Sequence, residues 1–248
     1  MNYVQIGKGT RPAVVFAHGW ARTHRDFIPA AESLSGHMAS LLVDLPVFGD
    51  TPRPPEGWTT VDYADHMAGF IRDHVDGPIV YVGHSFGARV GLRLAVRHPE
   101  LLSGLVLVAG AGLPTQRPTL QRWKGKLRQM QFRVLRDRAR DEAEREALEV
   151  RFGSPDYVQS RTLGLRDIFL NAVREDQSPD LPRIKAPTVV LNGARDTETT
   201  PELGRRMSAL IPNSRFIRLP EFDHIDILHR GRHVIGLRVK ELVGMNAA

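Results

Sequence analysis

The sequence contains no cysteine. This absence excludes disulfide bonds, thiolate metal ligands and cysteine nucleophiles together. The ten histidines show no paired ligand spacing, so a zinc site is not expected either. We therefore expect a chain that works with no metal and no other cofactor.

Long apolar runs are also absent. No uncharged stretch approaches the roughly 18 residues that cross a membrane, and the longest candidate, residues 104–113, has the length of a buried strand with its turn. The first residues lack a basic region followed by an apolar stretch, so no signal peptide is expected. These absences predict a cytoplasmic protein with no membrane partner.

Positive charge is unevenly distributed along the chain. Of 248 residues, 42% are hydrophobic and 25% charged, which is ordinary for a globular protein. The net charge is +6, and residues 117–151 carry eleven Lys/Arg against six Asp/Glu. This segment is either a solvated helix surface or a surface that attracts an acidic substrate or protein partner. No recognition motif accompanies the charge, so nucleic-acid binding is not expected.

Short apolar runs rich in Val, Leu and Ile recur, and each is followed by a turn. They occupy residues 13–17, 41–44, 79–82, 105–109, 189–192 and 216–219. Continuous apolarity is typical of strands buried on both faces of a parallel sheet. Helical patterns lie between these runs, at residues 60–75, 86–97, 201–210 and 229–243. The alternation predicts an α/β fold with a mostly parallel central sheet and helices on both faces.

One long segment interrupts this alternation. No strand pattern occurs between residues 112 and 181. Apolar side chains there recur at helical spacing, with basic residues between them, at Leu120, Trp123, Leu127, Met130 and Val134. Residues 141–150 and 155–174 also have helical patterns. We expect core segments 1–111 and 181–248 to flank a helical lid at 112–180, with Trp123, Leu127, Met130 and Val134 facing the substrate.

A G-x-S-x-G motif is formed by Gly83, Ser85 and Gly87, between an apolar strand and a helix. The small glycines permit a sharp turn that holds the serine hydroxyl out near the start of the helix, where negative charge is favoured. The motif therefore predicts Ser85 as a nucleophile. The alternative is a glycine-rich turn with a serine that takes no part in chemistry.

A second turn, at His18-Gly19-Trp20, follows the first strong apolar strand. Acyl transfer builds a negative oxygen in the transition state, and preorganised backbone N–H groups stabilise it. We expect the N–H groups of Trp20 and Phe86 to form this oxyanion hole. His18 is a possible base, but holding the loop by hydrogen bonds is the favoured interpretation.

An aspartate and a histidine end the loops that follow the last two strands. A serine hydroxyl needs an adjacent base, and a buried carboxylate orients an imidazole base. These requirements predict His224 as the base and Asp196 as its acid. One alternative is that Asp196 only stabilises the turn that contains it. Another is that Asp223 or Asp226 is the acid.

With these residues, the sequence resembles the α/β-hydrolase superfamily over nearly its whole length. The resemblance includes the order Ser85, Asp196, His224, residues 182–188 before the acid-bearing strand, and the segment at residues 42–50. In that segment Val47 stands where the family usually has glycine. The His18-Gly19-Trp20 turn, Leu45-Pro46 and the basic lid are similar to the esterase type that cleaves pimeloyl carrier-protein methyl esters.

The resemblance implies a serine hydrolase that cleaves a carboxylic ester, thioester or lactone through an acyl-enzyme on Ser85. One alternative is a cofactor-free lyase or oxygenase that uses His224 as base. Another is a ligand-binding hydrolase with slow turnover. The expected partner is a small ester-like substrate, and an acidic carrier protein is a further candidate.

Overall fold

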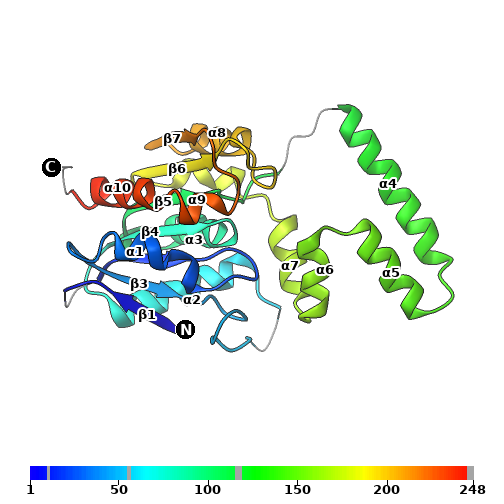
Figure 1. Cartoon of the computed structure of the whole chain (residues 1–248), viewed down its shortest axis with the longest axis horizontal. Coiled ribbons are helices and arrows are strands. Elements are labelled where there is room, and N and C mark those ends of the chain that lie inside the picture. Colours follow the sequence, from blue (N-terminus) through cyan, green and yellow to red (C-terminus); the bar gives the residue numbers. More distant parts are fainter. Residues whose placement is uncertain (10–11, 55–56, 115–118, 245–248) are drawn as a thin grey trace. The chain divides into compact units, whose positions relative to one another are not determined.

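Seven strands form one sheet in the order β1-β3-β2-β4-β5-β6-β7 (Figure 1). The computed structural model describes residues 1–9, 12–54, 57–114 and 119–244. Its strands are β1 (Tyr3–Ile6), β2 (Pro12–Ala17), β3 (Ala39–Val43), β4 (Ile79–His84), β5 (Leu102–Val108), β6 (Thr188–Gly193) and β7 (Ser214–Leu219). All neighbouring pairs are parallel except β1 with β3, which is antiparallel.

The central strands are apolar along their length because both of their faces are covered. Every residue of β3, β4 and β6 is buried. Alternate side chains point to opposite faces of a strand. In β4, Val80 and Val82 therefore join one hydrophobic cluster, while Tyr81 faces the other side and packs against Gly91.

Helices cover both faces of the sheet, as the sequence predicts. The cluster that contains Val80 and Val82 also contains residues of α1 (Ile28–Glu32), α9 (Asp226–His229) and α10 (Arg232–Leu242). The opposite face carries α2 (Thr60–His74), α3 (Phe86–Arg97) and α8 (Pro201–Leu210). The described residues of this part of the chain also form three short 3-10 helices, His24–Phe27, Pro99–Leu101 and Ser178–Arg183.

A helical insertion lies between β5 and β6 in the sequence. It contains α4 (Thr119–Asp137), α5 (Glu142–Phe152), α6 (Pro155–Thr162) and α7 (Arg166–Arg174). The sequence predicts one helix over residues 155–174, but Gly164 interrupts it with φ +67. This left-handed conformation ends a helix and is easily adopted only by glycine. Within the insertion, the rings of Phe132 and Phe152 pack 5.7 Å apart and join α4 to α5.

The chain divides into two compact units, Met1–Leu113 with Asn171–Ala248, and Pro114–Leu170. The sequence-based lid, 112–180, thus differs from the second unit chiefly at its C-terminal end. The reason is a set of polar contacts within the first unit. Glu175 pairs with Arg93 at 2.6 Å, and the Gln177 N–H donates to the Gly112 carbonyl at 3.0 Å.

No described helix has the length and apolarity required to cross a membrane.

Candidate active site

Ser85 occupies a strained turn between β4 and α3. Its backbone has φ +48 and ψ −104, a conformation that non-glycine residues rarely adopt. A Cβ on Gly83 would lie 2.5 Å from the Gly87 carbonyl oxygen, and a Cβ on Gly87 would overlap the carbonyl of Ala17. Both glycines are therefore required by close backbone approach, as the motif predicts. Ser85 itself is partly exposed at the start of α3.

The turn at His18-Gly19-Trp20 is bound to the start of the same helix. The Gly87 N–H donates to the His18 carbonyl at 3.0 Å, and the rings of Trp20 and Phe86 pack edge to face at 5.5 Å. The two residues expected to supply oxyanion donors are thus neighbours in space. The structure brings them together beside Ser85, the residue that precedes Phe86.

His18 is held between two loops. Its Nδ1 lies 2.7 Å from the Gly19 carbonyl oxygen, and its Nε2 accepts a hydrogen bond from the Leu45 N–H at 3.0 Å. Burial lowers the pKa of His18 to about 4. Both nitrogens of this neutral ring are engaged in holding loops, which disfavours His18 as the base.

His224 and Asp196 are in direct contact. The imidazole Nδ1 lies 2.8 Å from the Asp196 Oδ2, and both residues are buried. Asp196 Oδ1 also accepts the N–H groups of Glu198 and Thr199 at 2.9 Å each. These contacts fix the carboxylate in the orientation that an imidazole base needs.

The other aspartates considered from the sequence have different partners. Asp223 Oδ1 accepts the backbone N–H groups of Ile225 and Asp226, which lower the pKa of Asp223. Asp226 lies 3.3 Å from Arg230. The carboxylate that contacts His224 Nδ1 is therefore that of Asp196.

Two backbone contacts bring together the loops that carry Asp196 and His224. A Cβ on Gly193 would overlap the carbonyl of Phe222, and that carbonyl accepts the Arg195 N–H at 3.0 Å. His224 also contacts β4, because His84 Nε2 donates to the His224 carbonyl at 3.0 Å. His84 directly precedes Ser85. The loops after three parallel strands thus meet at one sheet edge, where ligands bind in open α/β folds.

Backbone strain concentrates at this edge. The four described non-glycine residues with positive φ are Ala21, Val47, Ser85 and Ala109. They follow β2, β3, β4 and β5 respectively. Such strain persists only where the surroundings hold it, and it clusters at functional sites. Val47, at the family's glycine position, has φ +76, so the valine retains a glycine-like backbone.

Sequence reasoning missed two residues in the turn after Asp196. The Thr199 hydroxyl lies 2.9 Å from Asp196 Oδ2 and 3.3 Å from His224 Nδ1. Glu198 Oε2 lies 3.5 Å from His224 Nε2. An aspartate in the turn after a strand often accepts the next backbone N–H groups, as in an Asx-turn, and this signal could have indicated the backbone contacts of Glu198 and Thr199 but not their side-chain contacts with His224.

The apolar residues expected to face the substrate lie on α4, in the second unit. Trp123, Leu127, Met130 and Val134 are 65%, 52%, 58% and 43% exposed. The side chain of Leu120 lies outside the described residues. The four residues share one helix stripe, and their contact with substrate stays a prediction.

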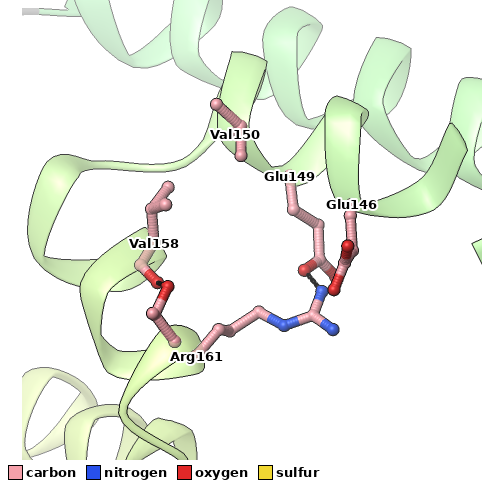
Figure 2. Close-up of a pocket in the computed structure, with 6 residues that line it drawn as sticks. Glu146, Glu149, Val150, Val158 and Arg161 are labelled. Atoms are coloured by element: carbon pink, nitrogen blue, oxygen red, sulfur yellow. Dashed lines mark hydrogen bonds and ion pairs between the residues drawn. The ribbon is translucent and has the colours of Figure 1, made fainter. Parts of the chain in front are cut away.

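A pocket of about 210 Å³ lies within the insertion, lined by residues of α5 and α6. Figure 2 shows the guanidinium of Arg161 directed toward Glu149 and Glu146. Arg161 forms an ion pair with Glu149 and lies 3.6 Å from Glu142. These contacts join α5 to α6, and the lining residues include no histidine or nucleophile–base pair. The pocket is therefore a structural feature of the insertion.

The family model of the alpha/beta hydrolase fold matches residues 12–230. A pimeloyl-[acyl-carrier protein] methyl ester esterase of Chromobacterium violaceum is 26% identical over 241 residues, 92% of this chain and 93% of that protein. A 2-(acetamidomethylene)succinate hydrolase of Mesorhizobium japonicum is 35% identical over 101 residues, 41% of this chain but only 36% of that protein.

Solved structures share the same architecture. The enol-lactonase of Burkholderia xenovorans matches with a TM-score of 0.73 and 22% identity, covering 98% of this chain and 96% of the lactonase. A thermophilic esterase of Thermogutta terrifontis matches with a TM-score of 0.71 and 22% identity, covering 99% and 94%. The fold, the site geometry and the family model agree, and the chain belongs to the α/β-hydrolase family.

Proposed function

We propose that this chain is a serine hydrolase that cleaves a carboxylic ester, or a related thioester or lactone, through an acyl-enzyme on Ser85. The observation that carries the proposal is the 2.8 Å hydrogen bond between His224 Nδ1 and Asp196 Oδ2, beside a turn that holds Ser85 at φ +48. His84, the residue before Ser85, contacts the His224 carbonyl at 3.0 Å, and an imidazole that a carboxylate orients is the group that activates a serine hydroxyl on such a turn.

The chemistry proceeds in two steps. His224 Nε2 takes the proton of Ser85 as the hydroxyl oxygen attacks the carbonyl carbon, and the N–H groups of Trp20 and Phe86 stabilise the resulting oxyanion. The leaving alcohol or thiol departs with the proton from His224, which leaves the acyl group on Ser85. A water molecule then gives a proton to His224 and attacks the acyl carbon. His224 returns the proton to Ser85 as the acid is released.

The substrate proposal starts from the apolar stripe on α4. We infer that Trp123, Leu127, Met130 and Val134 contact an apolar acyl or alcohol part. The rings near Ser85 support the same choice, because Phe48 packs against Trp20 at 5.1 Å and lies 6.2 Å from Phe86. The names of the similar esterase and lactonase describe ester and lactone chemistry, which supports the bond class.

Replacing Ser85 by alanine tests the mechanism. Ser85→Ala should lose at least about a thousandfold in turnover of a short p-nitrophenyl ester, the scale of loss when a member of such a triad is removed. The matched control is Ser103→Ala, an exposed serine on β5, which should retain wild-type turnover. Near-full activity of Ser85→Ala would contradict an acyl-enzyme on this residue.

An acidic carrier protein is proposed as a second partner, on the basis of charge. Helix α4 and the turn after it present three exposed basic residues, Arg133, Arg136 and Arg140. Opposite charges at exposed positions attract more strongly at low salt. Reversing all three to glutamate should weaken binding of an acidic carrier protein roughly tenfold at low salt, given about 0.2–1 kcal/mol for each exposed pair.

The control for this binding experiment changes the net charge equally but in the first unit. It reverses three exposed basic residues there, Arg183, Lys185 and Arg215. Affinity measured by calorimetry should fall in the α4 variant and not in the control. Equal affinities for both variants would remove the carrier protein as a partner of α4 and leave the esterase proposal intact.

A further inference from the structure

The imidazole of His224 has a carboxylate near each of its nitrogens. Asp196 Oδ2 lies 2.8 Å from Nδ1, and Glu198 Oε2 lies 3.5 Å from Nε2. The mechanism proposed above uses only Asp196. Nε2 is the nitrogen that exchanges a proton with Ser85, so Glu198 stands beside the reacting proton.

The position of Glu198 follows from the turn that carries it. Asp196 Oδ1 accepts the N–H of Glu198 itself and that of Thr199, at 2.9 Å each. The side-chain hydroxyl of Thr199 lies 2.9 Å from Asp196 Oδ2. The carboxylate that orients the base therefore also holds the backbone from which Glu198 reaches Nε2.

A carboxylate at this place acts differently on the two forms of the imidazole. In neutral His224 the proton lies on Nδ1, toward Asp196, and Nε2 presents a lone pair that a carboxylate oxygen repels. In the imidazolium, Nε2 carries a proton and the same carboxylate attracts it. The imidazolium forms in both steps of the proposed mechanism, so a group that favours it affects acylation and deacylation alike.

We propose that Glu198 is a positioning residue that stabilises protonated His224 from the Nε2 side and thereby sets the pH range in which the enzyme works. This inference rests on the proposed function, because it assigns His224 as the base. Glu198 acts through the imidazole and forms no bond with the substrate. Its side chain is 60% exposed, so salt screens the interaction.

Other charged and titratable groups surround the same ring. Asp196 contacts Nδ1, and Asp223 precedes His224 in the loop. His84 lies across the ring at 4.7 Å between centroids, and burial lowers its pKa well below the usual value. Arg22 pairs with Asp26 at 2.7 Å, and it also interacts electrostatically with Glu198 and with His84. These groups are common to the wild type and to a Glu198 variant, so a difference between the two reports on the carboxylate at Nε2.

The test is a titration of His224 by NMR in wild type and in Glu198→Gln, with the free enzyme at low salt. Glutamine keeps the shape of the side chain and removes its charge, and residue 198 contacts Asp196 through its backbone N–H, which the substitution leaves in place. We expect the midpoint for His224 to fall by about half a pH unit in the variant, the size typical of an exposed charge pair. The shift should shrink at 1 M salt, and the acid limb of the kcat/KM profile should move the same way.

The matched control is Glu202→Gln, which removes an exposed carboxylate paired with Arg205 on α8. It should leave the His224 midpoint and the pH profile at their wild-type values. Coincident titrations of wild type and Glu198→Gln at low salt would overturn the inference.

Failure of the inference and failure of the proposed function are distinguishable. The NMR midpoint is read without turnover, so it reports on Glu198 whatever Ser85 does. An active Ser85→Ala enzyme would end the proposed function. An enzyme that depends on Ser85 but shows no change in Glu198→Gln would end this inference alone.

Discussion

Two buried histidines near this site contribute to the stability of the folded protein in a way that depends on pH. Burial lowers the pKa of His18 to about 4, from an ordinary value of 6.5, and lowers that of His84 well below 6.5. Each ring uses its Nε2 to connect separate segments of the chain, His18 to Leu45 and His84 to His224. Neutral imidazole is thus part of the folded structure, whereas the unfolded chain is free to protonate both rings.

This difference predicts a pH-dependent stability. Between about pH 6.5 and 4 the unfolded chain binds more protons than the folded one, so the free energy of unfolding is highest above pH 6.5 and falls with falling pH. His18 alone contributes a loss on the order of 3 kcal/mol by about pH 4. Urea unfolding at several pH values measures the slope.

His18→Gln should flatten that slope, although it lowers stability at neutral pH by disturbing the Leu45 contact. His37→Gln, at an exposed position, should keep the wild-type slope. Equal slopes of the unfolding free energy against pH for wild type and His18→Gln would show that His18 is not the source of the pH dependence.

At the scale of elements, close backbone approaches decide where the loops meet. Gly193 packs against the Phe222 carbonyl, and Gly87 against the Ala17 carbonyl. The first approach joins the end of β6 to the loop after β7, and the second joins α3 to the end of β2. The site is therefore a property of how the loops pack as much as of the residues they carry.

Replacing Gly193 by alanine tests this dependence. Its new methyl group would overlap the Phe222 carbonyl, so the two loops must separate. We expect a loss of about 1–3 kcal/mol in the free energy of unfolding, the usual cost of overpacking, and at least a tenfold fall in ester turnover. Chemical denaturation and a steady-state assay measure the two effects.

Gly69→Ala is the matched control, because a Cβ at this α2 position meets nothing within 4 Å. It should keep full activity and stabilise α2 slightly, since alanine favours helix over glycine. A Gly193→Ala enzyme as stable and active as Gly69→Ala would contradict the packing account.

The sequence predicts six of the strands near their observed places, because apolar runs buried on both faces carry a strong signal. It does not predict β1, an edge strand whose residues alternate between exposed and partly buried. It predicts a last helix from residue 229, whereas α9 ends at His229 and α10 begins at Arg232, after Gly231. Residue periodicity gives only a weak signal for short helices and strands whose position depends on tertiary contacts.

The same limit applies within the site. The motif glycines and the order of Ser85, Asp196 and His224 can be recognised along the chain. The contact of Glu198 with His224 depends on the backbone path of a turn, which sequence spacing does not specify. Likewise, the sequence shows valine at position 47 but not that its backbone has φ +76.

On the scale of the whole molecule, the net positive charge and the predicted catalytic residues lie in different parts of the chain. Residues 117–151 carry nearly all of the net positive charge, and they lie in the second unit. The predicted nucleophile, base and acid all lie in the first. The helical unit is inserted between β5 and β6, and the sheet edge that positions those three residues lies wholly in the first unit. The proposed chemistry and the proposed partner binding can therefore be altered independently by mutation.

The most direct measurement is covalent labelling of the native enzyme with a fluorophosphonate, followed by mass spectrometry of the intact chain and of its peptides. Such a probe is attacked by an activated serine hydroxyl and remains bound to it. The account predicts one label per chain, on the peptide that contains Ser85, and no label in His224→Ala. A chain that hydrolyses esters while Ser85 stays unlabelled would contradict it.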